Sequence, residues 1–222
     1  MMARRGVLGV LAVGAVAVLG GCGLVVSENF YRFRMTVEVE TPQGLKSGSS
    51  VMEVIATKGS IQIGDQNGSG IGMRGEAVVI DTADGPLFVL LKQPDAEGPL
   101  ARSVTLAMVP DALQQGVIAT VGKLGGIFGG GKGELSRDDW PMMVRFRDIN
   151  DPKSVVKVNP EAVGVKRIVV ETTSDDVTTG IEKRLVWLSD EGLTLDPAGR
   201  PTINPTFAQT IRQREFSTEI GK

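Results

Sequence analysis

The fold is decided by one alternating stretch, Phe30-Tyr31-Arg32-Phe33-Arg34-Met35-Thr36-Val37-Glu38-Val39-Glu40, whose odd positions are apolar or aromatic and whose even positions are mostly polar. A period of two over this length predicts a half-buried β-strand. The next residues, Thr41-Pro42-Gln43-Gly44, place Pro and Gly at the second and fourth positions of a type I turn. The run Ser49–Thr57 then reads as a returning strand. We therefore expect an antiparallel hairpin.

Outward from this hairpin, short apolar runs bounded by turn residues predict more strands, at Ser60–Ile63, Glu76–Asp81, Leu87–Leu91, Met142–Arg147 and Lys166–Thr172. Helix signals are few: Asp111–Gln115 is closed by a Gly, and Asn159–Gly164 has a cap residue, an early Pro and a closing Gly. The segment Thr179–Leu188 fits a helix or a strand. The pattern predicts an α+β, mainly β fold of antiparallel strands, sandwich or barrel-like, with a few short helices, in one domain over residues 28–222.

Composition excludes several functions. The chain of 222 residues contains no His, which rules out Ser-His-Asp and Cys-His catalysis and His-ligated zinc. It holds 24 Lys and Arg against 26 Asp and Glu, and residues 1–21 contain two of these bases and no acid, so the remainder carries a formal charge of −4. Binding of a nucleic acid is favoured by clustered Lys and Arg side chains, which this composition does not offer, so we expect no nucleic-acid partner. The 29 Gly residues favour turns and strands over long helices.

The N-terminus has the layout of a secretory signal. Arg4 and Arg5 precede an uncharged apolar run, Gly6 to Leu19, and the run ends at Leu19-Gly20-Gly21-Cys22. This ending resembles the lipobox of bacterial lipoproteins. The resemblance implies that residues 1–21 are removed as a signal peptide and that the thiol of Cys22 carries diacylglycerol, with a further acyl chain such as palmitate on the new amine. Residues 22–29 would then form a lipidated tether that reaches at most roughly 25 Å.

Other interpretations of this segment remain open. The 21 uninterrupted apolar or small residues from Gly6 to Val26 could span a bilayer uncleaved, or form a buried helix, and Cys22 could be an incidental thiol. The lone cysteine favours the lipid, because it has no partner for a disulfide within the chain. Gly23 follows it where an Asp would suggest retention in the inner membrane. We expect a membrane-anchored protein of the cell envelope, at the outer membrane and facing the periplasm.

Two Gly-rich segments resemble nucleotide-binding loops but lack their context. Gly126-Ile127-Phe128-Gly129-Gly130-Gly131-Lys132 spells part of a phosphate-binding loop, but Gly133 stands where Ser or Thr would hold magnesium. A mobile surface loop or an interdomain joint over Gly122 to Gly133 explains it better. Gly70-Ile71-Gly72-Met73-Arg74-Gly75 spells a dinucleotide fingerprint, but a strand sequence follows where a helix is required. No cofactor is therefore predicted.

Oxygen-bearing side chains suggest a weak metal candidate. Asp65, Asn67, Ser69 and Glu76 repeat the ligand spacing of a calcium-binding loop around a Gly turn. Strand-like flanks replace the usual helices, and a Gly-rich hairpin loop accounts for the pattern with fewer assumptions. The sequence therefore predicts no metal site, with calcium as the alternative.

Acidic pairs supply weak catalytic candidates. Asp148 and Asp151 lie close together before and after Asn150, and two carboxylates about 5 to 9 Å apart could cleave a glycosidic bond. Asx turns explain such clusters more simply. An envelope hydrolase working through Asp148 and Asp151 is thus the alternative to a non-enzymatic module.

Four segments are similar to a group of uncharacterised proteobacterial proteins: Tyr31–Pro42, Ser47–Val51, Phe146–Val155 and Thr178–Leu185. This resemblance implies no activity. From the residues we expect a membrane-anchored envelope lipoprotein with a binding or structural role, whose partner is an envelope protein or a small ligand.

Overall fold

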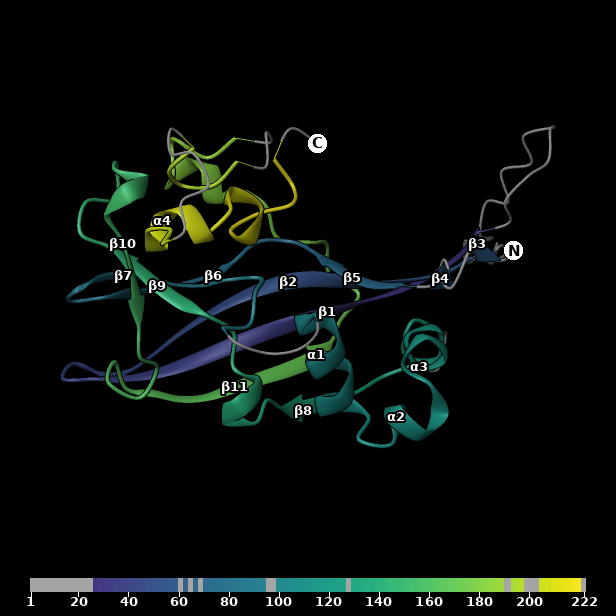
Figure 1. Cartoon of the computed structure of the whole chain (residues 1–222). Coiled ribbons are helices and arrows are strands. Elements are labelled where there is room, and N and C mark those ends of the chain that lie inside the picture. The colour runs from purple at the N-terminus through teal and green to yellow at the C-terminus, as the bar shows by residue number, and fades with distance from the viewer. Residues whose placement is uncertain are drawn as a thin grey trace, which may run out of the picture.

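The computed structural model describes residues 26–59, 62–63, 66–67, 70–94, 99–126, 129–189, 193–197 and 204–220 (Figure 1). Two antiparallel sheets dominate it, with strand orders β5-β2-β1-β11-β8 and β10-β9-β7-β6, and β3 and β4 form a separate small hairpin. The expected α+β, mainly β fold is confirmed. The strands are β1 Val26–Thr41, β2 Gly44–Gly59, β3 Gln62–Ile63, β4 Gln66–Asn67, β5 Gly70–Arg74, β6 Val78–Thr82, β7 Gly85–Val89, β8 Lys132–Glu134, β9 Met143–Phe146, β10 Val155–Val158 and β11 Val165–Thr172.

The helical elements are short. They are the α-helices α1 Leu100–Met108, α2 Ala112–Gln115, α3 Val117–Leu124 and α4 Phe207–Thr210, and the 3-10 turns η1 Arg137–Asp139, η2 Pro152–Ser154, η3 Ile181–Lys183 and η4 Gln213–Glu215. Only α1 and α3 exceed two turns among the described residues. The helices therefore cover the sheets and do not form a layer of their own.

The centre of the five-stranded sheet is the predicted hairpin, which is longer than the alternation alone required. β1 and β2 pair without interruption from Val26↔Gly59 to Thr41↔Gly44. The odd-numbered residues of β1 between Tyr31 and Val39 are buried, and the even-numbered residues of β2 between Ser50 and Ala56 lie on the same face. This common face, called the inner face below, buries apolar side chains and so supplies the main stabilisation of the sheet.

The four-stranded sheet packs over the inner face near the hairpin turn. β6 lies against β2, and the two backbones come so close that a Cβ on Gly48 would stand 2.3 Å from the carbonyl oxygen of Val79. Because only Gly lacks that atom, Gly48 sets the distance between the sheets at this point. Ile80 and Leu87 then enter the core that both sheets share.

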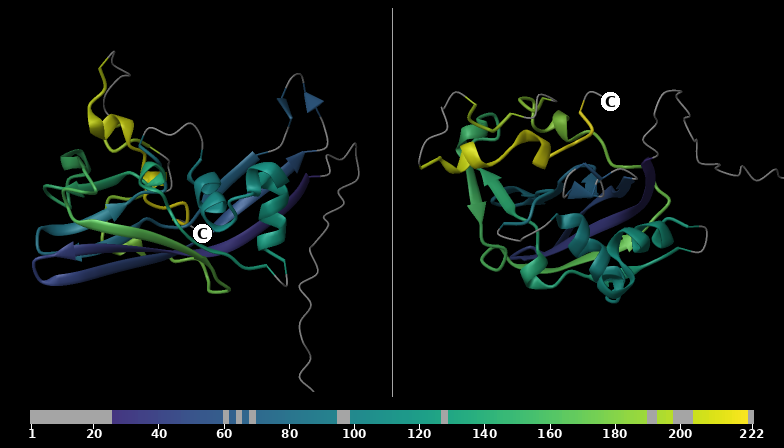
Figure 2. Two further views of the ribbon diagram at one scale, coloured as in Figure 1. Left: turned by 90° about the horizontal axis from the view of Figure 1, so that it is seen from below. Right: turned by 45° about the vertical axis from the view of Figure 1, so that its right-hand side comes forward.

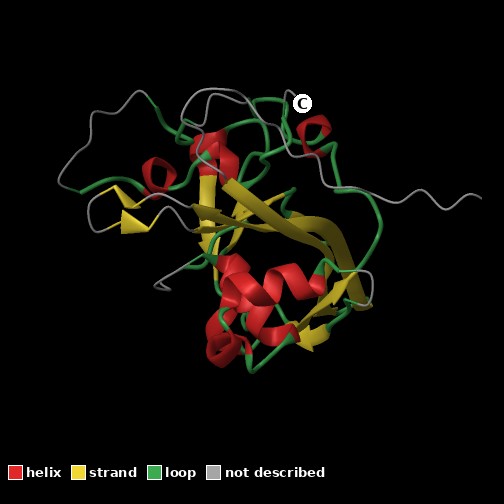
Figure 3. Cartoon of the chain, turned by 90° about the vertical axis from the view of Figure 1, so that its right-hand side faces the viewer, coloured by secondary structure: helices red, strands yellow, loops and turns green. Residues whose placement is uncertain are grey.

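The remainder of the inner face is covered by the helices. Figures 1 and 3 show α1, α2 and α3 gathered beside the far half of the long strands. α1 inserts Leu100, Val104 and Met108 into the core, and its Thr105 shares a hydrogen bond of 2.9 Å with the hydroxyl of Tyr31. Burial raises the pKa of Tyr31, while this bond lowers it. The phenol is therefore neutral and ties α1 to β1.

The C-terminal part of the chain covers the other face of the four-stranded sheet (Figure 2). A second apolar cluster lies between them, with Leu185 and Ile211 fully buried. Its centre is a group of four rings whose centroids lie 5.4 to 5.9 Å apart, Phe88, Phe146, Trp187 and Phe216. Edge-on and tilted contacts of this kind stabilise beyond their buried area. The four-stranded sheet is thus buried on both faces.

Two sequence predictions need correction at their boundaries. β1 begins at Val26, so residues 26–29, assigned to the tether, belong to the strand and to the folded domain. The segment Ser60–Ile63, predicted as a strand, contributes only Gln62–Ile63 among the described residues. The predicted strands at Glu76–Asp81, Leu87–Leu91, Met142–Arg147 and Lys166–Thr172 correspond to β6, β7, β9 and β11 within a few residues.

Of the two helix predictions, one was correct. Asp111 to Gln115 contains α2. Asn159–Gly164 is a turn, because the side chain of Asn159 accepts a hydrogen bond from the Glu161 amide and the chain must enter β11 at Val165. Thr179–Leu188, left open between helix and strand, is neither, and contains only η3. Its apolar residues pack into the second cluster, so tertiary contacts determine its path.

Candidate functional site

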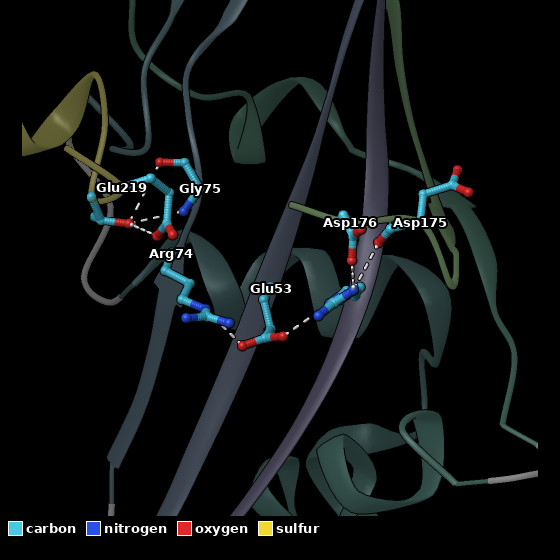
Figure 4. A network of polar contacts seen from close by, with 8 residues as sticks. Glu53, Arg74, Gly75, Asp175, Asp176 and Glu219 are labelled. Carbon is cyan, nitrogen blue, oxygen red and sulfur yellow. Dashed lines mark hydrogen bonds and ion pairs between the residues drawn. The ribbon is translucent and has the colours of Figure 1, made fainter. Parts of the chain in front are cut away.

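The outer face of the five-stranded sheet carries a network of ion pairs, shown in Figure 4. Glu53 on β2, with a side chain only 5% exposed, receives Arg32 at 3.2 Å and Arg74 at 2.7 Å on its two oxygens. Arg32 continues to Asp176 at 2.8 Å. Each charge in this network is therefore paired. Ion pairs of this kind fix the positions of the side chains more than they create a binding site.

This network attaches residues 173–180, called the crossing segment below, to the outer face of the sheet. The segment leaves β11, and its Thr173 amide donates to the carbonyl of Arg32 on β1. The Thr178 amide then donates to the Val51 carbonyl on β2, and the Thr178 hydroxyl accepts from the Val51 amide. The segment thus crosses the sheet and occupies the free edge of β2 beyond the end of β5.

The crossing segment ends at a buried carboxylate. Glu76 is 3% exposed, and its two oxygens accept hydrogen bonds from the amides of Gly180 and Ile181 and from the hydroxyl of Ser217. Burial raises the pKa of Glu76, and these three donors partly offset the rise. Glu76 therefore fixes the start of η3 through the Gly180 and Ile181 amides. Through Ser217 it also connects the C-terminal part of the chain to the sheets.

These contacts bear on the calcium candidate. Glu76, the proposed twelfth-position ligand, uses its oxygens on protein donors. Asn67 lies in β4, while Asp65 and Ser69 lie outside the described residues. Within the described part of the chain, no group of three His, Cys, Asp or Glu could hold a metal ion. The geometry thus gives Glu76 a structural role.

The acidic pair occupies an exposed turn between β9 and β10. Asp148 accepts hydrogen bonds from the backbone and side-chain nitrogens of Asn150, and Asp151 accepts from the Lys153 amide at 2.9 Å. The hydroxyl of Ser154 donates to the carbonyls of both acids. Both carboxylates therefore shape the turn, as the Asx-turn interpretation expects.

The two Gly-rich segments also have structural explanations. Gly70 to Arg74 forms β5, and Gly75 turns the chain toward β6, so no helix follows the fingerprint. Gly122 lies in α3 and Lys132 begins β8, so the segment predicted as a loop is partly regular. Ile127 and Phe128 lie outside the described residues.

The lipidation candidate Cys22 and the signal segment also lie outside the described residues. In the part of the chain that is described, no helix is long and apolar enough to cross a membrane.

A cavity between β5, the start of α1 and the C-terminal segment is the best candidate for a ligand site. Its volume is about 480 Å³, within the range usual for small-molecule pockets. Apolar side chains form part of its wall, namely Met73, Leu91, Pro99, Leu100 and Ala101. The remainder is polar and comprises Lys92, Gln93, Arg214, Glu215 and Thr218. The wall is thus about half apolar and half polar, and apolar side chains together with convergent polar groups are typical of sites that orient a small ligand.

Glu215 distinguishes this cavity electrostatically, and we call it the Glu215 cavity. One carboxylate oxygen, Oε1, pairs with Lys92 Nζ at 3.2 Å. The other, Oε2, is buried and has no hydrogen-bond partner among the described residues. A buried acceptor without a donor is unfavourable by about 1 to 3 kcal/mol. Because this oxygen has almost no accessible surface, protein atoms cover it, and it does not present an acceptor to the cavity.

Two cations complete the polar part of the wall. Lys92 is held by the carbonyl of Thr210 at 3.3 Å as well as by Glu215, and its side chain is 34% exposed. Arg214 is exposed, and no acid in the described part of the chain pairs with it. The cavity wall therefore carries the Lys92–Glu215 ion pair and the additional positive charge of Arg214.

Sequence reasoning missed this site, because its residues come from four distant segments with no motif in common. The closest signal was the spacing of Leu100, Val104 and Met108, four residues apart, which would have placed a helix start at Pro99. No protein-family model, curated protein or solved structure matches the chain. We therefore infer function from the residues and from the geometry of the cavity.

Proposed function

We propose that this protein is a membrane-anchored envelope lipoprotein that binds a small ligand in the Glu215 cavity without catalysing a reaction. The observation that carries the proposal is a cavity of about 480 Å³ whose wall combines apolar side chains with the ion pair of Lys92 and Glu215 and with the exposed Arg214. The alternative, hydrolysis by Asp148 and Asp151, gains no support from the geometry, because both carboxylates cap backbone amides in an exposed turn.

The start of β1 bears on the anchor. Val26 follows Cys22 by four positions, so a lipid on Cys22 would hold the start of the strand within about 14 Å of the membrane surface. Two or three acyl chains would anchor the protein stably, since each buried methylene contributes about 0.8 kcal/mol. The Glu215 cavity would thus be accessible to solutes close to the membrane.

Replacing Cys22 with Ala tests the anchor. Without the thiol no thioether forms, so we expect the protein either free of the membrane or retained as an uncleaved precursor. Membrane fractionation together with mass spectrometry of the N-terminus checks this. A cleaved Cys22→Ala chain that still sediments with membranes would show that the lipid does not hold the protein.

Ligand binding is tested by thermal melting of the full lipidated protein in detergent micelles against a library of small metabolites. We expect at least one compound to raise the melting temperature, because a ligand that binds only the folded state stabilises it. The Glu215→Gln variant should lose that rise, since it removes the ion pair with Lys92 that forms part of the cavity wall. Glu182→Gln, which changes an exposed acid outside the cavity, should keep it. If no compound raises the melting temperature, the proposed function is wrong.

A further inference from the structure

We infer that the ligand of the Glu215 cavity is a short extended peptide that pairs with the free edge of β5 and places one apolar side chain in the cavity. This inference rests on the proposed function and names the class of ligand that the same site fits. It follows from the backbone groups at the edge of β5 and from the position of the cavity beside them.

The free edge of β5 can be assigned residue by residue. β5 lies at the end of the five-stranded sheet, so only its edge toward β2 is paired. In antiparallel strands, the amide and carbonyl of one residue point to one neighbouring strand and those of the next residue to the other. Val51 of β2 bonds away from β1, to Thr178, so Ile55, four residues later, also points away from β1 and toward β5. Its partner Gly72 therefore points toward β2, and the residues on either side of Gly72 point to the free edge.

These two residues, Ile71 and Met73, present an amide and a carbonyl each. Among the described residues, no group bonds to them on that side of the strand. The next residue with the same orientation, Gly75, is already paired: its amide donates to the hydroxyl of Thr218 at 2.9 Å, and its carbonyl accepts from the Thr218 amide. The free part of the edge is therefore short and ends at Thr218.

β5 lacks the features that usually protect an edge strand, namely Lys or Pro residues and outward-facing charges. Its one charged residue, Arg74, is paired with Glu53 at 2.7 Å. Ile71 and Met73 are half-buried and pack against the main core. A strand added here would therefore cover apolar surface as well as pair with the backbone.

The cavity lies where such a strand would place a side chain. Met73 pairs with Val54, which is buried on the inner face, and Met73 also lines the cavity. Residues directly opposite each other on paired strands share a face, so the side chain opposite Met73 would enter the cavity beside Leu91 and Leu100. The next residue would lie opposite Gly72 on the outer face, where an added Cβ has no atom within 4 Å. The site thus fits alternating residues, with apolar side chains toward the inner face.

The length of the edge favours a peptide over a second copy of the chain. β5 has five residues, and Thr218 occupies its continuation at Gly75. Pairing over this length is small for two folded proteins, whose stable interfaces bury at least about 1,200 Å². An extended peptide needs only main-chain hydrogen bonds for affinity and a pocket for alternate side chains for specificity.

Isothermal titration calorimetry of the full lipidated protein in detergent micelles tests this pairing with the uncharged peptide N-acetyl-Thr-Leu-Thr-Leu-Thr-amide. Its leucines match the positions opposite Ile71 and Met73. Since the strands of this sheet pair antiparallel, both leucine amides should face β5 and the central threonine amide should face away. Methylation of the leucine amides should weaken binding by about tenfold or more, while methylation of the central threonine amide should leave it unchanged.

The same titration tests the role of the cavity. Replacing both leucines of the peptide with serine should weaken binding by about tenfold or more, because the apolar wall then receives a polar side chain.

Ile71→Pro tests the edge without changing the cavity, which Ile71 does not line. Proline removes an amide that points away from β2, so no bond of the sheet is lost, and edge strands tolerate this change. Peptide binding should weaken by about tenfold or more. Ile71→Val keeps the amide and should bind the peptide as the wild type does.

Hydrogen exchange of the wild type gives a second measurement, which does not depend on how well a variant folds. The amides of Ile71 and Met73 should exchange rapidly in the protein alone and slowly with the peptide bound. The Gly72 amide, which points toward β2, should not change.

The outcomes distinguish this inference from the proposed function. If the two methylated peptides bind equally, or if the peptide leaves the Ile71 and Met73 amides unprotected, the peptide inference is wrong. A library compound that stabilises the wild type and not Glu215→Gln would then still support the proposed function. If both amides are protected without peptide and the protein sediments as a dimer, a second copy occupies the edge and the inference is likewise wrong. If no compound, the peptide included, raises the melting temperature, both the inference and the proposed function fall.

Discussion

Replacing Gly48 with Ala should lower the free energy of unfolding by about 3 kcal/mol or more, the upper end of the usual range for an overpacked core. The added Cβ would lie 2.3 Å from the Val79 carbonyl oxygen and 2.9 Å from Cγ1 of Ile80. The first of these atoms is backbone, which cannot rotate away. The two sheets must therefore separate locally, which opens gaps in the apolar core between them. Urea denaturation monitored by circular dichroism measures the change.

Gly72→Ala is the matched control. Gly72 lies in β5, and an added Cβ there has no atom within 4 Å. Because Ala loses less conformational entropy than Gly on folding, this variant should be neutral or slightly more stable. Equal stabilities of Gly48→Ala and Gly72→Ala would mean that β2 and β6 do not approach as closely as the structure has them.

Glu76→Ala should be destabilising by roughly 3 to 5 kcal/mol. The carboxylate accepts from Gly180 N at 3.1 Å, Ile181 N at 3.0 Å and Ser217 Oγ at 3.2 Å. Removal leaves three donors in a buried site, each unfavourable by about 1 to 3 kcal/mol unless water enters. The C-terminal part of the chain should loosen first, and hydrogen exchange of the Gly180 and Ile181 amides would detect this before global unfolding.

Glu182→Ala serves as the control for Glu76→Ala. Glu182 belongs to η3, two or fewer residues from both amides, but its side chain is exposed. Its removal should change the free energy of unfolding by no more than about 0.5 kcal/mol. Protection of the two amides that survives in Glu76→Ala would show that Glu76 does not hold η3.

Glu76 also makes the stability depend on pH. Its pKa is raised in the folded state by burial, so ionisation is less favourable in the folded than in the unfolded chain. The stability contribution of this group is therefore highest below its ordinary pKa, and it falls as the pH rises to the folded pKa. Glu76→Gln cannot ionise, so the difference in unfolding free energy between it and the wild type should shift in favour of the variant over that interval.

The sequence predicted the sheets well where burial has a period of two. The odd residues of β1 between Tyr31 and Val39 are buried and the even residues between them are only half-buried, so the alternation reports the two faces of the sheet directly. It stopped short of the true length, because the hairpin extends to Val26 and Gly59 through residues without alternation. The ends of the hairpin are held by backbone pairing between β1 and β2, and not by an alternation of apolar and polar residues.

Elements that depend on long-range contacts were not predictable. α3 contains Gly122, which argues against a helix, yet Val121 and Leu124 bury against the long strands. The Gly180 and Ile181 amides at the start of η3 donate to the carboxylate of Glu76, more than 100 residues earlier. For the same reason the candidate residues from local motifs, such as Asp148 and Asp151, stayed apart from the Glu215 cavity, which unites residues 73 to 218.

The placement of β1 has a mechanical consequence. If the protein is held at Cys22, any pull between membrane and domain acts along the axis of β1, which pairs with β2 on one side and β11 on the other. The hydrogen bonds of antiparallel strands run perpendicular to that axis. Such a load shears many bonds together and does not unzip them one at a time. If Cys22 is the anchor, β1 would thus be well arranged to resist tension.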